Sequence, residues 1–516
     1  MEDLKEPVSP TGQFLESDFL NLYIIGVLEF QVPIHNLPIV SLVRDAFHCI
    51  PRFTSIMVVD QKGVKRWKRV EVKFEEHIIE PKFSDAMSME KQYGEYLSGI
   101  AMEKLPKNKP LWEAHIIKYP TKNAAGTVIF KFHHAIGDGY TIMGLLLSSL
   151  QRHDDPSLPL SFPSKSSSSS NKDYNSNKLF LLKILPKLFS ITFNSIVDFG
   201  WSVMKSTFLE DDETPIRSNV EGVEFLPITI SHISFSIHHI KEIKSKLGVT
   251  INDVITGIIF YGIRLYMQDM DYKSRKLKST AMAIVNTRNV KDYHTVQDML
   301  KTNAKGVWGN HISYMHVSVP KLQDYPISNP LQFVKKAHNS IKRKKNSFAT
   351  ILTEKLLRME HKLKGSEEVS KNIHRTLRNS SLLISNMVGP MEQMALANHP
   401  IKDLFFTLCG LPQSLVVTIL SYMGMLRVTL ATEEGFIDER KLVWNLNKAF
   451  EEILHEAENV YHTAALFRRL LFCCPPFFVL TSSVLCNDTR TRLTFVTLRK
   501  LKGSFSLEEA KTKKQV

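Results

Sequence analysis

A polar, low-complexity stretch divides this 516-residue chain into two parts. Residues 154–177 read DDPSLPLSFPSKSSSSSNKDYNSN, and a segment of Pro, Ser and Asn cannot bury an apolar core. We therefore expect it to be disordered. The sequence on either side alternates strand-like and helix-like patterns, which favours α/β domains. We predict an N-terminal domain over residues 1–153 and a linker with an apolar helix over residues 154–215. A C-terminal domain follows over residues 216–465, and residues 466–516 form an atypical, poorly ordered tail.

The pattern of apolar residues gives a coarse list of elements in each part. In the first part we predict strands at residues 22–30, 55–59, 112–118 and 127–132, and helices at 38–47 and 140–150. In the second part we predict strands at 228–237, 281–286, 312–319 and within 381–432, and helices at 238–248, 251–268, within 331–380 and at 440–458. Gly248 is a typical helix stop, and Asn252 or Asp253 is the expected cap of the helix that follows.

Three apolar segments resemble membrane spans by hydropathy. Residues 179–205 contain Lys183, Lys187, Asp198 and Pro186, so a helix lying in a membrane interface or against the protein fits better than a span. Residues 404–426 are interrupted by a Gly-Pro turn and rich in β-branched residues, which favours two buried strands. Residues 470–487 contain two consecutive prolines that would break a helix.

The net charge of +14 is concentrated in two blocks. Residues 331–380 hold 13 Lys/Arg against four Asp/Glu, and residues 466–516 hold ten against three. Local blocks of this kind suit a membrane surface, an anionic cofactor or solvated helices. They do not suit a nucleic-acid binder, whose charge covers a whole face with interleaved aromatic residues. Five cysteines are too few for a disulfide scaffold and favour a reducing compartment.

The motif HHAIGDG, residues 133–139, follows a predicted strand directly and precedes a predicted helix. Its glycines permit a tight turn or the close approach of a substrate, and Asp138 lies where a helix N-terminus favours a carboxylate. An imidazole at such a junction can take a proton from an alcohol near neutral pH. The alternative to a catalytic role is that His133 and His134 only pack against neighbouring side chains. A zinc site is weaker, because no Cys or second His lies nearby at ligand spacing.

Together with other short motifs, this segment resembles the plant wax ester synthase/diacylglycerol acyltransferase family of the WSD1-like type. HHAIGDG is similar to that family's HHxxxDG motif, which peptide-synthetase condensation domains share. The order of the accompanying motifs makes the resemblance specific: they are Pro110-Leu111-Trp112-Glu113, Asn252-Asp253, Asn286-Thr287-Arg288, Trp308-Gly309-Asn310, SNMVGP at 385–390 and the late GLPQSL and SYMGML. The resemblance fades after about residue 465.

The resemblance implies a fold and a set of residue roles. The fold is that of CoA-dependent acyltransferases, with two chloramphenicol-acetyltransferase-like α/β domains and an active-site tunnel between them. His134 would be the general base, and His133 and Gly139 would shape the site. Asp138 would orient the loop by pairing with Arg288, and Asn286 would contribute to oxyanion stabilisation. No metal and no permanently bound cofactor is implied, since acyl-CoA is a co-substrate.

The implied activity is O-acyl transfer from acyl-CoA to a long-chain alcohol, giving a wax ester, or to diacylglycerol, giving triacylglycerol. The resemblance also implies contact with a membrane surface and a location at the endoplasmic reticulum membrane, with the plasma membrane as a second site, and no nucleic-acid partner. Two alternatives stay open. One is a catalytically impaired, lipid-binding paralogue, because the unfamiliar tail could disturb the last helix. The other is an acyltransferase acting on soluble acceptors.

Overall fold

The computed structural model describes residues 4–84, 88–161, 178–288, 309–322 and 329–473. By its internal contacts the chain forms two units, Met1–Glu458 and Asn459–Val516, and the elements that follow belong to the first unit except where α11 runs on beyond Glu458. The predicted disorder of the linker falls mostly on residues 162–177, and the predicted tail falls mostly on 474–516; both ranges lie outside the described residues.

A seven-stranded sheet carries the histidine motif. Its strand order is β5-β6-β7-β2-β14-β13-β8. The strands are β2 (Tyr23–Phe30), β5 (Ile78–Ile79), β6 (Trp112–Ile117), β7 (Gly126–His133), β8 (Gln151–Arg152), β13 (Met394–Leu396) and β14 (His399–Cys409). β2 and β7 are almost completely buried, and their long apolar runs match the strands that the sequence predicts there.

The second half of the chain completes this first sheet. β14 pairs antiparallel with β2 from Tyr23 to Phe30, although more than 360 residues separate the two strands along the chain. The sequence predicts two buried strands with a Gly-Pro turn over residues 404–426, and both strands are present. They do not pair with each other, because the chain passes from one sheet to the other at Gly410. This glycine has φ +79°, and a Cβ there would lie 2.2 Å from the Asn21 carbonyl oxygen.

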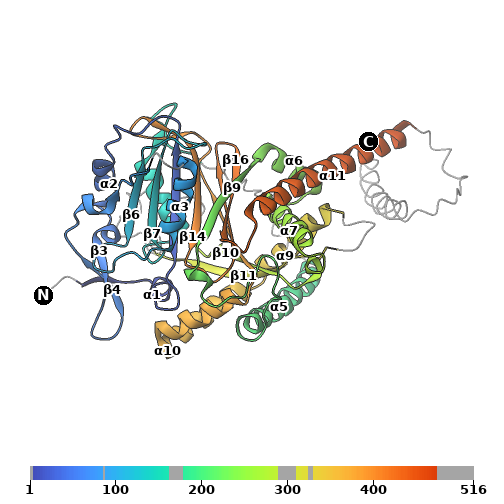
Figure 1. The fold of residues 1–516 in the computed structure, drawn as a ribbon. Coiled ribbons are helices and arrows are strands. Elements are labelled where there is room, and N and C mark those ends of the chain that lie inside the picture. The colour runs from blue at the N-terminus through green and yellow to red at the C-terminus, as the bar shows by residue number, and fades with distance from the viewer. Residues whose placement is uncertain (1–3, 85–87, 162–177, 289–308, 323–328, 474–516) are drawn as a thin grey trace, which may run out of the picture. The chain divides into compact units, whose positions relative to one another are not determined.

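A six-stranded sheet forms the centre of the second half. Its order is β11-β10-β12-β15-β16-β9. The strands are β9 (Ile228–Ser236), β10 (Thr280–Asn286), β11 (Ile312–Ser318), β12 (Leu382–Val388), β15 (Leu415–Tyr422) and β16 (Met425–Glu433). β14 of the first sheet packs beside β15 and β16 of the second, so the two sheets share one compact unit (Figure 1). The predicted boundary between two domains at the serine-rich linker stays a prediction.

Helices cover one apolar face of the second sheet. They are α6 (Ile237–Leu247), α7 (Ile251–Met270), α9 (Leu331–Lys345) and α11 (Glu439–Cys473). Gly248 ends α6 in the left-handed conformation, as predicted. The predicted cap of α7 is wrong: Thr250 is the N-cap residue, and Asp253 is its capping-box partner, because a carboxylate three residues on can accept from the cap's backbone N–H.

The described residues contain no single helix with the length and hydropathy of a membrane span. The pair α6 and α7 meets the length and composition criteria together, with a bend of 101° between the two helices.

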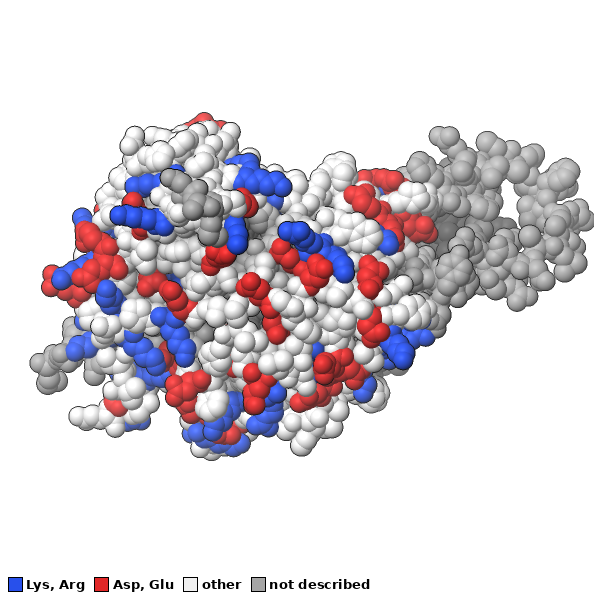
Figure 2. All heavy atoms as spheres, viewed as in Figure 1, with Lys and Arg blue, Asp and Glu red and all other residues white. Residues whose placement is uncertain are grey.

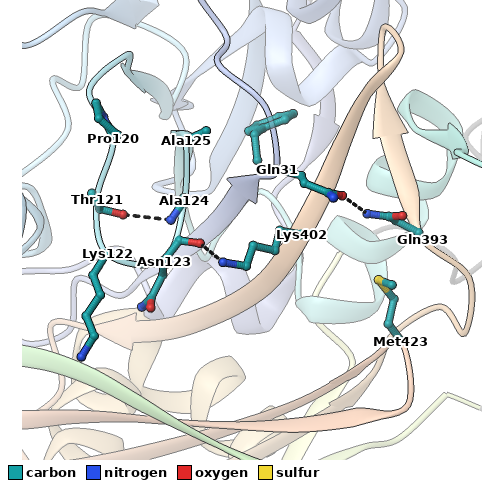
Figure 3. Close-up of a pocket in the computed structure, with 11 residues that line it drawn as sticks. Gln31, Pro120, Thr121, Lys122, Asn123, Ala124, Ala125, Gln393, Lys402 and Met423 are labelled. Atoms are coloured by element: carbon teal, nitrogen blue, oxygen red, sulfur yellow. Dashed lines mark hydrogen bonds between the residues drawn. The ribbon is translucent and has the colours of Figure 1, made fainter.

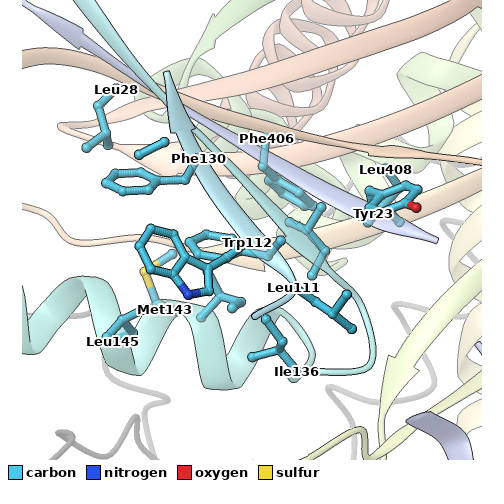
Figure 4. Close-up of a cluster of buried hydrophobic side chains, with 14 of the residues drawn as sticks. Tyr23, Leu28, Leu111, Trp112, Phe130, Ile136, Met143, Leu145, Phe406 and Leu408 are labelled. Atoms are coloured by element: carbon cyan, nitrogen blue, oxygen red, sulfur yellow. The ribbon is translucent and has the colours of Figure 1, made fainter. Parts of the chain in front are cut away.

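An aromatic core supports the strand that carries the motif. The Trp112 side chain is completely buried, donates from Nε1 to the Phe53 carbonyl oxygen at 2.9 Å, and stacks on His77 with ring centroids 4.3 Å apart. Figure 4 shows Trp112 and Phe130 packed above α4 (Gly139–Ser149), with Met143 and Leu145 on the helix side. The Leu111 carbonyl oxygen accepts from the His133 N–H at 2.9 Å. The segment 110–113 therefore holds the end of β7 in place.

The remaining elements surround these two sheets. They are β1 (Leu4–Pro7), α1 (Pro10–Phe14), α2 (Ile39–Phe47), β3 (Ser55–Val59), β4 (Lys65–Arg69), α3 (Met89–Met102), α5 (Lys178–Thr207) and α10 (Ala349–Arg378). β1, β4 and β3 form a small third sheet. The apolar segment 179–205 is helical, as predicted, and forms most of α5. α10 bends sharply at Gly365, where φ is +84°.

Charged side chains of both signs are interspersed over the surface in Figure 2. On that face Lys and Arg lie beside Asp and Glu, with uncharged surface between them, and no broad area of one sign is visible. The basic block of residues 331–380 lies on α9 and α10.

Candidate active site

The motif HHAIGDG forms the junction between β7 and α4. His133 is the last residue of β7, and Asp138 is the N-cap of α4. The Asp138 Oδ1 atom accepts from the backbone N–H and the hydroxyl of Thr141, both at 3.2 Å. The His134 N–H donates to the Leu22 carbonyl oxygen at 2.8 Å, which ties the loop to the chain just before β2. Two rigid elements therefore fix the loop that carries His134.

Asn310 holds His134 through two hydrogen bonds. The His134 Nδ1 atom lies 2.8 Å from Asn310 Oδ1, and the Asn310 Nδ2 atom donates to the His134 carbonyl oxygen at 2.7 Å. Both side chains are buried. Because Nδ2 is the donor of the second bond, Oδ1 must face the imidazole, and an amide oxygen can only accept. Nδ1 therefore carries the proton, and Nε2 carries the lone pair that a general base needs.

Burial keeps both histidines of the motif neutral. It lowers the pKa of His134 below the ordinary value of 6.5, and the nearby Asp138 carboxylate only partly opposes this effect. Burial lowers the pKa of His133 to about 3. Since a base must be unprotonated to act, His134 is competent across the whole neutral range.

Asp138 and Arg288 form a buried ion pair. The Arg288 Nη1 atom donates to Asp138 Oδ2, and the two side chains are only 2% and 3% exposed. The same carboxylate oxygen accepts from the His311 N–H at 3.0 Å. The Arg288 guanidinium also donates to the Gly309 carbonyl oxygen and lies 4.8 Å from the Tyr140 ring centroid. The structure thus brings together the two residues that the resemblance pairs, and Asp138 faces Arg288 and the backbone rather than His134.

His133 has a different environment from His134. Its Nδ1 atom accepts from the Ala135 N–H at 3.1 Å, its Nε2 atom lies 2.9 Å from Asn21 Oδ1, and its ring meets Tyr23 edge-on with centroids 5.2 Å apart. Both ring nitrogens are therefore used in holding the loop. This arrangement supports the expected shaping role of His133.

Gly139 lets the second half of the chain approach the helix N-terminus. A Cβ at this position would lie 2.3 Å from the Met387 sulfur, which comes from β12 within the SNMVGP motif. The site is therefore built from both halves: His134, Asp138 and Gly139 come from the first, and Arg288, Asn310 and Met387 come from the second.

The structure does not bring Asn286 to His134. Asn286 ends β10 and is exposed, and its Oδ1 atom accepts from the Arg288 N–H at 2.8 Å. That bond shapes the turn that leads to Arg288. Its expected part in oxyanion stabilisation stays a prediction. Trp308 of the Trp-Gly-Asn motif lies outside the described residues, whereas Asn310 of the same motif is the histidine's partner, a role that spacing in the sequence could not reveal.

Two buried acids and a half-buried histidine elsewhere have metal-like spacing. Ligand atoms of Glu29, His232 and Asp403 lie within 4.8 Å of one another. Arg427 pairs with Asp403, and burial raises the pKa of Glu29, which favours its neutral form. The Asp403 carboxylate is neutralised by the Arg427 guanidinium, and Glu29 is favoured in its protonated, uncharged form. The charges of this group therefore balance without an added metal ion.

A surface cavity of about 760 Å³ lies at the other end of β7. Figure 3 shows its lining by residues 120–125 of the β6–β7 turn, with Lys402 of β14 donating to the Asn123 carbonyl oxygen. β7 has eight residues, so its two ends are separated by about 25 Å. This cavity is therefore distinct from the surroundings of His134.

A junction between two sheets that sets a buried histidine, held by an asparagine, beside a buried Asp–Arg pair fits an acyltransferase of the CoA-dependent fold class. The sequence matches the wax ester synthase/diacylglycerol acyltransferase catalytic domain over residues 39–255 and the WS/DGAT C-terminal domain over residues 308–454. The chain belongs to the wax ester synthase/diacylglycerol acyltransferase family.

Curated relatives align over most of their length. The chain is 29% identical over 458 residues to wax ester synthase/diacylglycerol acyltransferase 4 of Arabidopsis thaliana, covering 84% of this chain and 87% of the relative. It is 27% identical to number 3 of the same set, covering 85% and 91%.

Solved structures confirm the predicted fold class. The wax ester synthase/diacylglycerol acyltransferase from Marinobacter aquaeolei VT8 superimposes with a TM-score of 0.55 at 15% identity, over 88% of this chain and 100% of that one. A starter condensation domain of rhizomide synthetase in complex with C8-CoA superimposes with a TM-score of 0.50 at 11% identity, over 88% and 94%.

Replacing Asn310 tests its role as a positioning residue. In Asn310→Leu the His134 imidazole loses the acceptor for its Nδ1 proton, so the proton is no longer held on Nδ1. We therefore expect kcat/KM to fall by about 10²-fold. In Asn310→Asp the acceptor stays and a negative charge is added. That charge raises the pKa of His134, so the acid limb of the kcat/KM–pH profile should move to higher pH.

The pH profile separates this role from simple packing. Wild-type activity should be flat above pH 6.5 and fall only below it, since burial lowers the pKa of His134. If Asn310→Asp leaves the acid limb where the wild type has it, Asn310 does not act on the protonation of His134.

Proposed function

We propose that this protein transfers a fatty acyl group from acyl-CoA to the hydroxyl of a long-chain alcohol or of diacylglycerol, with His134 as the general base. The observation that carries the proposal is the fixed neutral imidazole at the end of β7, with Nδ1 bound to Asn310 and Nε2 left for a substrate. The family's matched domains and the names of the curated relatives support the reaction class.

The chemical step needs only groups that this chain and its substrates supply. The acceptor O–H donates to His134 Nε2, and its oxygen attacks the thioester carbonyl carbon as the proton passes to the imidazole. The tetrahedral adduct then collapses, the carbon–sulfur bond breaks, and the imidazolium returns the proton to the CoA sulfur. One ester and one free CoA thiol are formed, and the enzyme is unchanged. Neither a resident metal nor an acyl-enzyme is required by this scheme.

Acyl-CoA as the donor and a membrane surface as the partner also belong to this proposal. Both acceptors are water-insoluble and collect in bilayers, so an enzyme that works at the endoplasmic reticulum membrane, with the plasma membrane as a second site, would meet them where they are concentrated. The solved condensation domain in complex with C8-CoA supports the donor.

The test is a product assay on membranes carrying the full chain. Radiolabelled palmitoyl-CoA is supplied with hexadecanol, with dioleoylglycerol, or with a water-soluble short-chain alcohol. Labelled wax ester or triacylglycerol is the expected product. Ester formed with the soluble alcohol alone would replace the proposal by a soluble-acceptor enzyme. No ester with any acceptor would overturn it in favour of a lipid-binding paralogue.

A further inference from the structure

From Phe189 onward, where the structure describes its side chains, the helix α5 is amphipathic in the reverse of the usual sense. Most surface helices turn an apolar stripe to the core and polar residues to water. In this part of α5 the fully buried side chains are polar, namely Ser195, Asp198 and Lys205, with the half-buried Ser202 between them, at spacings of three and four residues. Ser195, Asp198 and Lys205 are each less than 5% exposed. These residues form the inner face of the helix.

Specific polar contacts hold the inner face against the fold. Asp198 Oδ1 accepts from Arg343 Nη2 at 2.6 Å and from Lys344 Nζ at 3.2 Å, both on α9. Lys205 Nζ donates to Asp211 Oδ1 at 2.5 Å. Because buried ion pairs depend on geometry, these contacts fix the rotation of α5 about its own axis.

The opposite face of α5 is an exposed apolar stripe. It consists of Phe189, Phe193, Ile196, Val197, Trp201 and Met204, together with Phe208 directly after the helix, with exposed fractions between 43% and 74%. The stripe continues onto the start of α10, whose Phe348 is 55% exposed and donates from its backbone N–H to Ser195 Oγ at 2.8 Å. Figure 1 shows α5 beside α9 and α10 at the edge of the fold. We call this surface the α5 face.

Cations border the α5 face. The last turn of α9 holds Lys342, Arg343 and Lys345, all exposed, only a few residues before Phe348. Arg343 also links this border to α5 through Asp198. A cavity of about 280 Å³ joins the two surfaces, with Val197 and Trp201 on the apolar side and the Asp198–Arg343 ion pair on the other. An apolar stripe bordered by cations fits the interface of an anionic bilayer.

We propose that the α5 face docks on a lipid bilayer containing anionic phospholipids, with the lipid phosphates placed against the exposed cations Lys342 and Lys345 at its border. The inference deepens the membrane partner of the proposed function and rests on it. The proposal fixes how α5 is rotated about its own axis. The apolar stripe faces the acyl chains of the lipids, and the ion pairs of the inner face stay within the protein. A second copy of the chain is the alternative partner for the α5 face. In a symmetric dimer the cationic borders of the two copies would lie close to each other.

The experiment measures sedimentation of the purified full chain with vesicles, without acyl-CoA or acceptor. One set is phosphatidylcholine alone and the other contains phosphatidylserine as well. Ile196→Glu should lower the bound fraction on both sets by on the order of tenfold. Val59→Glu on β3 is the matched control, since Val59 is 65% exposed and Ile196 is 66% exposed. Trp201→Ala and Trp444→Ala form a second pair, with Trp444 on α11 being 57% exposed.

Charge reversal of the border separates headgroup recognition from apolar contact. Lys342→Glu/Lys345→Glu should weaken binding by about fivefold or more for each cation removed, only on the anionic vesicles and less so in high salt. Lys241→Glu/Lys244→Glu on α6 is the control. Equal binding by Ile196→Glu and Val59→Glu would overturn the proposal. So would a concentration-dependent dimer that Ile196→Glu abolishes while vesicle binding stays unchanged.

This measurement is independent of the reaction. An inactive His134→Ala variant is expected to bind vesicles like the wild type, so loss of docking and loss of ester formation can be told apart. Urea unfolding of each α5 variant checks the fold, and an unchanged midpoint is expected because the altered side chains lie in solvent.

Discussion

His134→Ala is expected to lower kcat/KM for ester formation by about 10²–10⁴-fold, the usual contribution of a positioned general base. The variant removes the only group in the β7–α4 loop that offers an unprotonated ring nitrogen, since both nitrogens of His133 are used by Ala135 and Asn21. The measurement is the initial rate of ester formation from labelled acyl-CoA and hexadecanol in detergent micelles.

Two controls make this result specific. His238→Ala changes an exposed histidine of a second His-His pair on α6 and should leave the rate unchanged. Circular dichroism and urea unfolding establish that His134→Ala is folded, because a buried side chain has been shortened. A folded His134→Ala enzyme with wild-type kcat/KM would remove His134 from the mechanism and leave the base unassigned.

The local part of the site could be predicted from the sequence because its residues are neighbours in the chain. A strand pattern that ends in two histidines, followed by Gly-Asp-Gly and a helix pattern, specifies the turn, the cap and the direction of the helix together. The pairing of Arg288 with Asp138 was accessible only through family resemblance, because 150 positions separate the two residues. Periodicity carries no information about contacts at that distance.

Asn310 shows where this reasoning ends. It lies 176 positions from His134 in a Trp-Gly-Asn motif that taken alone reads as a turn. The family resemblance gave a role to Asn286, which ends a predicted strand, yet the fold uses that side chain on the Arg288 backbone. Asn286 follows one strand and Asn310 precedes the next, and only the packing of the two sheets shows which of these two asparagines meets the histidine.

Fold topology was predicted unevenly for the same reason. Buried strands are recognisable from apolar, β-branched runs, but such runs do not name their partners. The two strands predicted on either side of the Gly-Pro turn are β14 and β15, and they belong to different sheets. In α5, hydropathy identified a helix, whereas the inverted orientation of its faces becomes visible only once Asp198 is seen to pair with α9.

Arg288→Met is expected to destabilise the protein by about 3–5 kcal/mol, the usual cost of leaving a buried charge without its partner. Asp138 would keep its bonds from Thr141 and His311, which favours the lower end of that range. A lysine would not substitute, since Arg288 reaches Asp138 and the Gly309 carbonyl oxygen with two different nitrogens of one planar group. The measurement is the free energy of unfolding in urea.

The double variant Asp138→Asn/Arg288→Met distinguishes an unpaired charge from lost packing. Asparagine still caps α4 but carries no charge, so the pair of substitutions removes the uncompensated carboxylate. We expect the double variant to regain a large part of the stability lost in Arg288→Met, a coupling that a double-mutant cycle measures directly. If the two single losses simply add, the ion pair contributes nothing of its own and Arg288 stabilises the loop through Gly309 and Tyr140 alone. Recovered stability with impaired ester formation would show that the pair also sets the position of the loop that carries His134.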